Sequence, residues 1–102
     1  MYNKLLKSGQ VTIPNKAQKH IGIQDGDSLY LYREQDHIVI VKHHTDHTLN
    51  KCIFHKGKVS IPAELRRLIG ISVGTLLEIN INNKHNKIII NIVKQNLLKD
   101  VQ

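Results

Sequence analysis

The chain has 102 residues, 40% of them hydrophobic, and carries a formal net charge of +7. This length allows one compact domain or two very small units that share one core, and the hydrophobic content excludes an intrinsically disordered chain. The positive charge favours a polyanionic partner, either nucleic acid or an anionic membrane surface.

The amino terminus and the single cysteine indicate the cellular compartment in which we expect the protein. The first residues, MYNKLLKSGQ, contain no apolar signal-peptide core, and no stretch approaches the roughly 18 apolar residues of a membrane span. We therefore expect neither a signal peptide nor a membrane-spanning segment. Cys52 is the only cysteine, so an internal disulfide cannot form, which fits a reducing cytoplasm. Its apolar neighbours indicate a small packing residue rather than a nucleophile.

An internal repeat is the strongest feature of the sequence. Shifted by 48 residues, the segment KSGQVTIPNKAQKHIGIQDGDSL aligns with HKGKVSIPAELRRLIGISVGTLL. The identical positions are glycines, a proline and apolar residues, for example Gly9 with Gly57 and Pro14 with Pro62. A shared backbone would fix these residue types. Beyond this block the shift becomes 50, and the two extra residues lie in the polar stretch NNKHNK, which we interpret as a hairpin loop.

Both repeats predict the same order of elements. A short strand comes first, from Tyr2 to Leu6 or from Lys51 to Phe54, followed by a glycine turn and a second strand, QVTI or KVSI. The proline then occupies the first position of a short helix, where its missing N–H is harmless. Gly22 or Gly70 ends the helix with a positive φ.

A turn and a hairpin complete each repeat. The hairpins are SLYLYR with HIVIVK and TLLEININ with KIIINIVK, both rich in β-branched and aromatic residues. In the second helix Leu65, Leu68 and Ile69 have the i, i+3, i+4 spacing of an apolar face, and we expect this face to meet the core.

The predicted organisation is a first ββαββ repeat over residues 1–42, a linker over 43–50, a second repeat over 51–94 and a short tail over 95–102. One repeat alone has too little sheet to close a core. We therefore expect a mostly β protein with short helices, in which the two repeats interleave into one pseudo-twofold β-barrel. Exchange of repeats between two chains would make the same contacts, so a homodimer or higher oligomer stays open.

The stretch GKVSIPAELRRLIGISVGT resembles the AbrB/SpoVT/MazE-type swapped-hairpin domain, with its glycine, basic residue, apolar strand, Pro-x-Glu-Leu-Arg helix and later glycine turn. The first repeat, GQVTIPNKAQKHIGIQDGD, keeps the strand, proline and glycines but lacks the Glu-Leu-Arg part. In this family two modules interleave their hairpins and present two short helices and adjacent loops to DNA. Two copies in one chain resemble the MraZ-type arrangement. The resemblance implies a cytoplasmic, nucleoid-associated transcriptional regulator that binds double-stranded DNA.

The family also contains antitoxins, in which a tail after the domain wraps a toxin. Here only residues 95–102 follow the second repeat, which is short for such an arm. An antitoxin-like role and a protein-binding module stay open as alternatives, with the apolar stretches IIINIV and NLL as a candidate partner site.

The expected DNA contacts lie mainly in the second repeat. Arg66 and Arg67 match the basic helix positions of the family, and guanidiniums on an exposed helix side can bridge phosphates or contact a guanine edge. The alternative is a solvated helix face. Glu64, in the first helical turn, favours the helix dipole and is interpreted as structural. The other candidates come from the strands, turns and helix of both repeats: Lys4, Lys7, Gln10, Gln18, Lys19, Lys51, Lys56 and Lys58.

The charge is divided unevenly between the halves. Residues 1–48 contain six Lys/Arg and five Asp/Glu, a net charge of +1, whereas residues 49–102 contain nine and three, a net charge of +6. We therefore expect the second repeat to supply most of the phosphate attraction, and the first repeat to tune register or sequence preference.

Two other kinds of site are considered and set aside. His43, His44 and His47, with Asp46 between them, would offer a metal three imidazoles and a carboxylate, but they lie in the predicted linker, so we expect no metal site and no cofactor. The sequence contains no Gly-x-Ser-x-Gly, P-loop or HExxH motif, and we expect no enzymatic activity.

Overall fold

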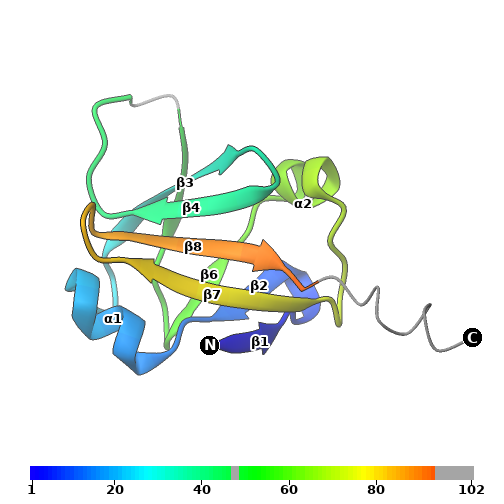
Figure 1. Ribbon diagram of the computed structural model, residues 1–102, viewed down its shortest axis with the longest axis horizontal. Helices are drawn as coiled ribbons and strands as arrows, with labels where there is room; N and C mark the ends of the chain where they lie inside the picture. Colours follow the sequence, from blue (N-terminus) through cyan, green and yellow to red (C-terminus); the bar gives the residue numbers. More distant parts are fainter. Residues whose placement is uncertain (47–48, 94–102) are drawn as a thin grey trace, which may run out of the picture.

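A computed structural model describes residues 1–46 and 49–93 (Figure 1). The first half contains β1 (Tyr2–Lys4), the 3-10 turn η1 (Lys7–Gly9), β2 (Gln10–Thr12), α1 (Asn15–Ile21), β3 (Ser28–Glu34) and β4 (His37–Val41). The second half contains β5 (Asn50–Ile53), β6 (Lys58–Ser60), α2 (Ala63–Ile69), β7 (Leu76–Asn82) and β8 (Lys87–Ile92). The prediction of a mostly β protein with two short helices is confirmed.

The strands form two antiparallel sheets. The larger sheet has six strands in the order β1-β7-β8-β4-β3-β5, and the smaller is a ribbon of β2 and β6. The large sheet curls strongly into a half-barrel, and the β2–β6 ribbon crosses behind it in Figure 1. The expected β-barrel-like architecture is therefore confirmed.

The strand pairings relate the two halves by an approximate twofold rotation. Val11 of β2 pairs with Val59 of β6, and these are equivalent positions in the repeat. Val39 of β4 pairs with Ile89 of β8, which are again equivalent. The axis therefore passes through both of these pairs. The outer strands also cross between the halves, because β1 pairs with β7 and β5 pairs with β3.

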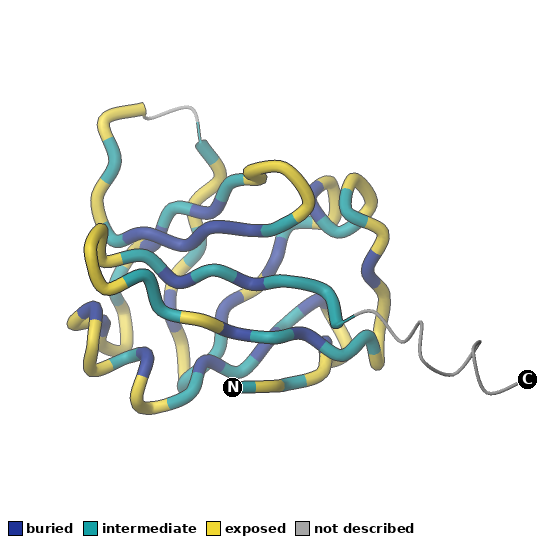
Figure 2. Tube along the Cα trace, viewed as in Figure 1, coloured by how far each residue is buried: buried dark blue, intermediate teal, exposed yellow. Residues whose placement is uncertain are grey.

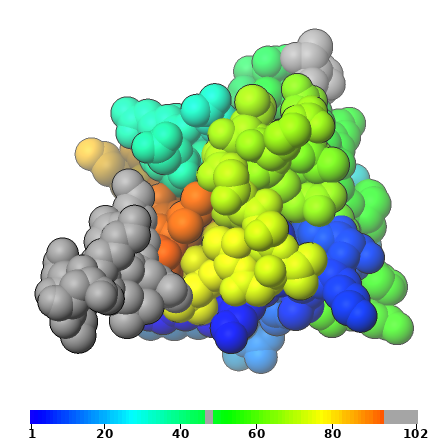
Figure 3. All heavy atoms as spheres, turned by 90° about the vertical axis from the view of Figure 1, so that its right-hand side faces the viewer, coloured from blue at the N-terminus to red at the C-terminus, as the bar shows by residue number. Residues whose placement is uncertain are grey.

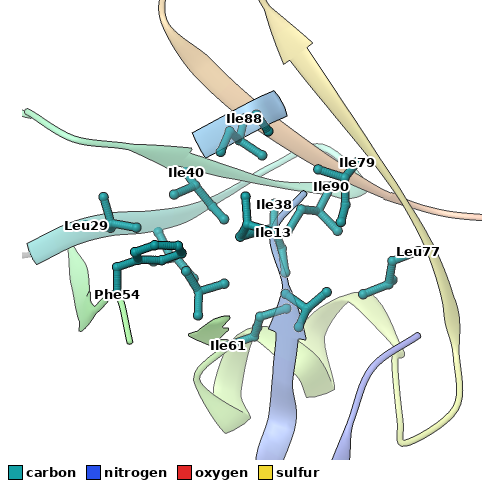
Figure 4. Close-up of a cluster of buried hydrophobic side chains, with 14 of the residues drawn as sticks. Ile13, Leu29, Ile38, Ile40, Phe54, Ile61, Leu77, Ile79, Ile88 and Ile90 are labelled. Carbon is teal, nitrogen blue, oxygen red and sulfur yellow. The ribbon is translucent and has the colours of Figure 1, made fainter. Parts of the chain in front are cut away.

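One apolar cluster fills the space between the sheets and draws on both halves (Figures 2 and 4). Ile38 and Ile40 of β4 and Ile88 and Ile90 of β8 are at most 1% exposed. Successive strand residues alternate between the two faces, so these side chains point inward together. Within the described residues no polar or charged side chain is buried. The core thus rests on apolar packing contributed by both halves.

Proline and glycine set the ends of the two helices. Pro14 and Pro62 have extended ψ values of 145° and 144° and stand one residue before the first helical position, so their predicted placement inside the helix is wrong by one residue. Their carbonyl groups accept the first helical hydrogen bonds, from the N–H groups of Gln18 and Arg66. Gly22 and Gly70 end the helices with φ values of 71° and 75°, as expected.

Two expectations about the placement of apolar residues are wrong. Leu5 and Phe54 were expected in the first strands, but both follow the strand and enter the core, where they are 1% and 2% exposed. Leu68 was expected to face the core and is 52% exposed. α2 packs against the core through Leu65 and Ile69, which are spaced i, i+4 and lie on one face of the helix. In this orientation Leu68 faces solvent.

The second half begins at Asn50, which was expected in the linker and is the first residue of β5. Residues 47–48 of the predicted linker lie outside the described residues, as do residue 94 of the second repeat and the whole tail over 95–102. Across the described ranges neither helix is long and apolar enough to cross a membrane.

Because both halves contribute to one cluster, we expect the protein to unfold in a single cooperative transition. Ile40→Ala removes a fully buried side chain and should lower the free energy of unfolding by about 2–5 kcal/mol. Ile53→Ala, at a position 57% exposed on β5, is the control and should cost less than about 1 kcal/mol. Urea unfolding followed by circular dichroism measures both. Two separate transitions would contradict a shared core.

Candidate nucleic-acid interface

The β2–β6 ribbon carries a polar face on the twofold axis. Val11 and Val59 point into the core, so strand alternation turns their neighbours outward, namely Gln10, Thr12, Lys58 and Ser60. Gln10 and Lys58 occupy equivalent positions of the two halves. The structure therefore brings these two predicted site residues onto one ribbon.

The edge strands β1 and β5 flank this ribbon and extend its polar face. The Asn3 amide donates a hydrogen bond to the Thr12 carbonyl at 2.7 Å, which ties β1 to β2. At the equivalent place Cys52 forms a hydrogen bond with the backbone of Ser60, which ties β5 to β6. We define the ribbon face as the outward polar side chains of these four strands, namely Lys4, Gln10, Thr12, Lys51, Lys58 and Ser60. The exposed side chains of Tyr2 on β1 and Ile53 on β5 lie beside them.

Cys52 itself has a packing role. The side chain is half-buried and packs against the core cluster. Burial raises the pKa of the Cys52 thiol, and the hydrogen bond with the backbone of Ser60 acts in the opposite direction. A raised pKa keeps the thiol protonated at neutral pH, and a protonated thiol is a poor nucleophile.

The turns beside the ribbon differ in charge. Lys56 is exposed, but its backbone N–H donates to Asp25 Oδ1 at 2.6 Å, and His55 Nδ1 lies 3.8 Å from the same oxygen. A neighbouring carboxylate weakens the attraction of this turn for phosphate. Lys7 is exposed in η1, and the residue equivalent to Asp25 in the turn beside it is the neutral Val73. Of these two predicted lysines, Lys7 is the better placed for an anion.

Arg66 does not project freely from α2. Its Nε donates to the Ile61 carbonyl at 3.0 Å, and the side chain is half-buried. The guanidinium lies against Gly9 of the other half, since a Cβ added to Gly9 would be 2.6 Å from both Cζ and Nε of Arg66. Gln18, its equivalent on α1, donates from Nε2 to the Ile13 carbonyl at 2.8 Å. Arg66 is therefore only partly exposed, and its Nε is already bonded to the backbone; the expected contact of Arg66 and Arg67 with DNA stays a prediction.

Arg67 and Lys19 are equivalent positions, and both are exposed. Glu64 is also exposed, in the first turn of α2, where a carboxylate favours the helix dipole. In the part of the chain that the structure describes, the Arg67 guanidinium makes no hydrogen bond or ion pair. Because α1 and α2 lie at opposite ends of the molecule (Figure 1), Arg67 and Lys19 are not brought together.

A second polar region was missed by the sequence reasoning. It is a groove of about 520 Å³ beside the carboxyl end of α1, lined among others by Tyr32, His43, His44 and Lys87. His47 lies outside the described residues, and across residues 1–46 and 49–93 no group of three or more His, Cys, Asp or Glu side chains is arranged to hold a metal ion. The signal for this region was the alternation that places Tyr30 and Tyr32 on one face of a strand.

Comparisons with known proteins concern the first half and the fold. Residues 4–46 match the model of the MazE family, described as antidote-toxin recognition MazE, bacterial antitoxin. The fuller sequence resemblance was seen in the second half, which this match does not cover. The solution structure of PHS018 from Pyrococcus horikoshii has a similar fold, with a TM-score of 0.52 over 90% of this chain and 87% of that chain, at 20% sequence identity. No curated protein matches the sequence.

The contact between Arg66 and Gly9 can be tested by a matched pair of substitutions. Gly9 and Gly57 have φ values of +75° and +78°, so alanine should cost about 1–2 kcal/mol of stability at either position. Only at Gly9 would the new Cβ also displace Arg66 and break its bond to Ile61, for about 1 kcal/mol more. Urea unfolding of Gly9→Ala and Gly57→Ala measures the difference.

The double variant Gly9→Ala/Arg66→Ala is the control. Without the arginine, the Gly9→Ala substitution should cost the same as Gly57→Ala. If the extra cost remains, Arg66 is not its cause.

Proposed function

We propose that the protein binds double-stranded DNA through the ribbon face and acts as a nucleoid-associated transcriptional regulator. The observation that carries the proposal is a two-stranded antiparallel ribbon on a twofold axis, with Gln10 and Lys58 directed outward from equivalent positions. Exposed Lys4 and Lys51 lie on the strands to either side. The proposed role is binding, without enzymatic activity.

The shape and chemistry of the ribbon face suit duplex DNA. The major groove of B-DNA admits a two-stranded β-ribbon. A protein with twofold symmetry favours pseudo-palindromic sites, in which each half contacts one half-site. Lysine ammonium groups neutralise phosphates, and the Gln10 amide has the donor and acceptor needed for an adenine edge.

The family match supports this class of function. A MazE-like segment over residues 4–46 supports a DNA-binding or antitoxin-like module. The second half repeats the same ββαββ order, so we infer two AbrB-like modules in tandem, sharing one barrel. Because the strands cross between the halves, one chain would supply the complete twofold face, and two chains that exchange halves would supply two such faces.

The most direct experiment is the selection of bound duplexes from a random pool at physiological salt. The proposal expects an enriched consensus with approximate twofold symmetry, in which one half-site is better defined than the other. An unenriched pool, together with no measurable duplex binding at low salt, would contradict it.

The unequal charge of the halves gives a second prediction. Lys58→Ala and Arg67→Ala should each weaken duplex binding and reduce the slope of log affinity against log salt by about 0.9 for each phosphate that the variant no longer neutralises. Their equivalents, Gln10→Ala and Lys19→Ala, are the matched controls and should reduce the slope less. Fluorescence anisotropy over a salt series measures all four. Equal slopes in each matched pair would refute the asymmetry.

The double variant Arg66→Ala/Arg67→Ala should weaken binding further than Arg67→Ala, because the Arg66 guanidinium lies beside Gly9 next to the ribbon. Gln18→Ala/Lys19→Ala is its equivalent and should have the smaller effect. Arg66 also holds a backbone carbonyl, so the unfolding free energy of each variant is measured alongside.

A protein-binding, antitoxin-like role is the second candidate, and an apolar end of the molecule favours it. Leu68 and Val73 are 52% and 61% exposed, and Leu68 also lines a groove together with Asp36, Ile69, Asn91 and Ile92. Figure 3 shows this end, where β8 (orange) is visible in a hollow between α2 and the β3–β4 hairpin. The test is a partner that co-purifies with the native chain, is absent with Leu68→Asp, and changes the mobility of the DNA complex.

A further inference from the structure

Two tyrosines share the outer face of β3. Leu29 and Leu31 point into the core, so alternation turns Tyr30 and Tyr32 to the opposite side. The His44 ring lies against both, with centroid distances of 6.3 Å to Tyr30 and 5.5 Å to Tyr32. We call the rings of Tyr30, Tyr32 and His44 together the tyrosine stripe.

Lysines from two other strands cover the tyrosine rings. Lys51 Nζ of β5 lies 5.3 Å from the centroid of Tyr30, and Lys87 Nζ of β8 lies 6.0 Å from the centroid of Tyr32. The second distance is at the outer limit of a cation–π contact, so a planar ligand can displace Lys87 from the ring at little cost. The displaced ammonium would remain beside that ligand.

The 520 Å³ groove continues from Tyr32 toward α1. Its apolar part is formed by Ile21 and Val41, and its polar part by Lys42, the three imidazoles of His43, His44 and His85, and Lys87. None of the described residues that line it is an aspartate or glutamate. Lys42 is held in place by a 2.7 Å hydrogen bond from Nζ to the Gly22 carbonyl, and its Nζ lies 3.6 Å from Asp27. The groove thus combines an aromatic ring, an apolar floor and two lysine ammonium groups, of which the charge on Lys42 is partly offset by Asp27.

The pseudo-twofold relation provides an internal comparison. On the other half, the positions of Tyr30 and Tyr32 are held by Glu78 and Asn80. Among residues 1–46 and 49–93, the equivalent groove is lined by Asp36, Leu68, Ile69, Asn91 and Ile92, which include no tyrosine, lysine or histidine. Since the same backbone is built without them, the fold does not require the aromatic and cationic side chains of the first groove.

We propose that this groove and the tyrosine stripe bind single-stranded nucleic acid. A nucleobase stacks on the Tyr32 ring, and the adjoining phosphates lie against the ammonium groups of Lys42 and Lys87. Aromatic side chains beside a positively charged groove are the combination by which proteins bind single strands without reading their sequence. The groove volume also lies within the range of about 300–1,000 Å³ that is usual for ligand sites.

The site is separate from the one proposed for duplex DNA. None of the residues that line the groove belongs to the ribbon face. Lys51 is the one residue common to the ribbon face and to the tyrosine rings, and it is therefore left unchanged in the test. Failure at one site would not entail failure at the other.

The test is fluorescence anisotropy with a labelled oligothymidylate, comparing Tyr32→Ala with Asn80→Ala at the equivalent position of the other half. Loss of one stacked base corresponds to roughly 5- to 150-fold weaker binding, from about 1–3 kcal/mol per base. We expect a loss in this range for Tyr32→Ala, native affinity for Asn80→Ala, and near-native affinity for Tyr32→Phe, which keeps the ring. Duplex affinity should be unchanged in all three.

Tyrosine fluorescence provides a readout that a general loss of stability would not mimic. The chain has no tryptophan and three tyrosines, so Tyr2→Phe leaves only Tyr30 and Tyr32 as emitters. Oligothymidylate should quench this emission by stacking on the Tyr32 ring. Thermal unfolding identifies any variant that fails to fold, in which case quenching in the Tyr2→Phe protein decides the question.

Three results would overturn the proposal. The first is that the native protein does not bind the oligonucleotide. The second is that Tyr32→Ala and Asn80→Ala have equal effects. The third is that thymidine monophosphate or inorganic phosphate competes as well as the oligonucleotide does, which would indicate a site for small anions.

Discussion

Pairing of strands across the pseudo-twofold axis is the interaction on which the rest of the structure depends. The Leu5 N–H donates to the Thr75 carbonyl at 3.0 Å, and the Phe54 N–H donates to the Asp27 carbonyl at 2.8 Å, so each half holds the turn of the other. The ribbon face exists only because of this exchange, since one of its two central strands comes from each half. Stability and the proposed DNA contact therefore share one physical origin, and a change that separates the halves would remove both.

The order of elements could be predicted because local chemistry determines it. Glycines with positive φ, prolines before helices and β-branched strands act over a few residues, and their repetition marked the two halves. The direction in which a short helix faces is instead set by docking. The pattern of Leu65, Leu68 and Ile69 fits either of two faces, and only the packed structure shows that Leu68 is solvent-exposed. The placement of Leu5 and Phe54 after their strands likewise depends on hydrogen bonds to the opposite half.

The positive charge of the candidate site could be predicted from the sequence, but the arrangement of its side chains could not. Counting charges identified the second half as the cationic one, and on the ribbon face Lys4 and Lys51 are exposed while Lys58 is half-buried. The hydrogen bond of Arg66 and its contact with Gly9 join residues far apart in sequence, so no local pattern indicates them. The groove beside Tyr32 was missed for the same reason, because its cations come from segments after β4 and β7. Equivalent positions of the two halves have the same backbone but different side chains here. Side chains that only one half carries are therefore not needed for the fold and are candidates for ligand binding.

The central claim is that the ribbon on the twofold axis is the surface that meets duplex DNA. An NMR titration of backbone amide signals with a selected duplex tests it most directly. We predict that the largest shifts fall on β2, β6 and the turns at Gly9 and Gly57, with similar patterns in both halves. Shifts confined to the end that carries Leu68 and Val73, with β2 and β6 unaffected, would contradict it.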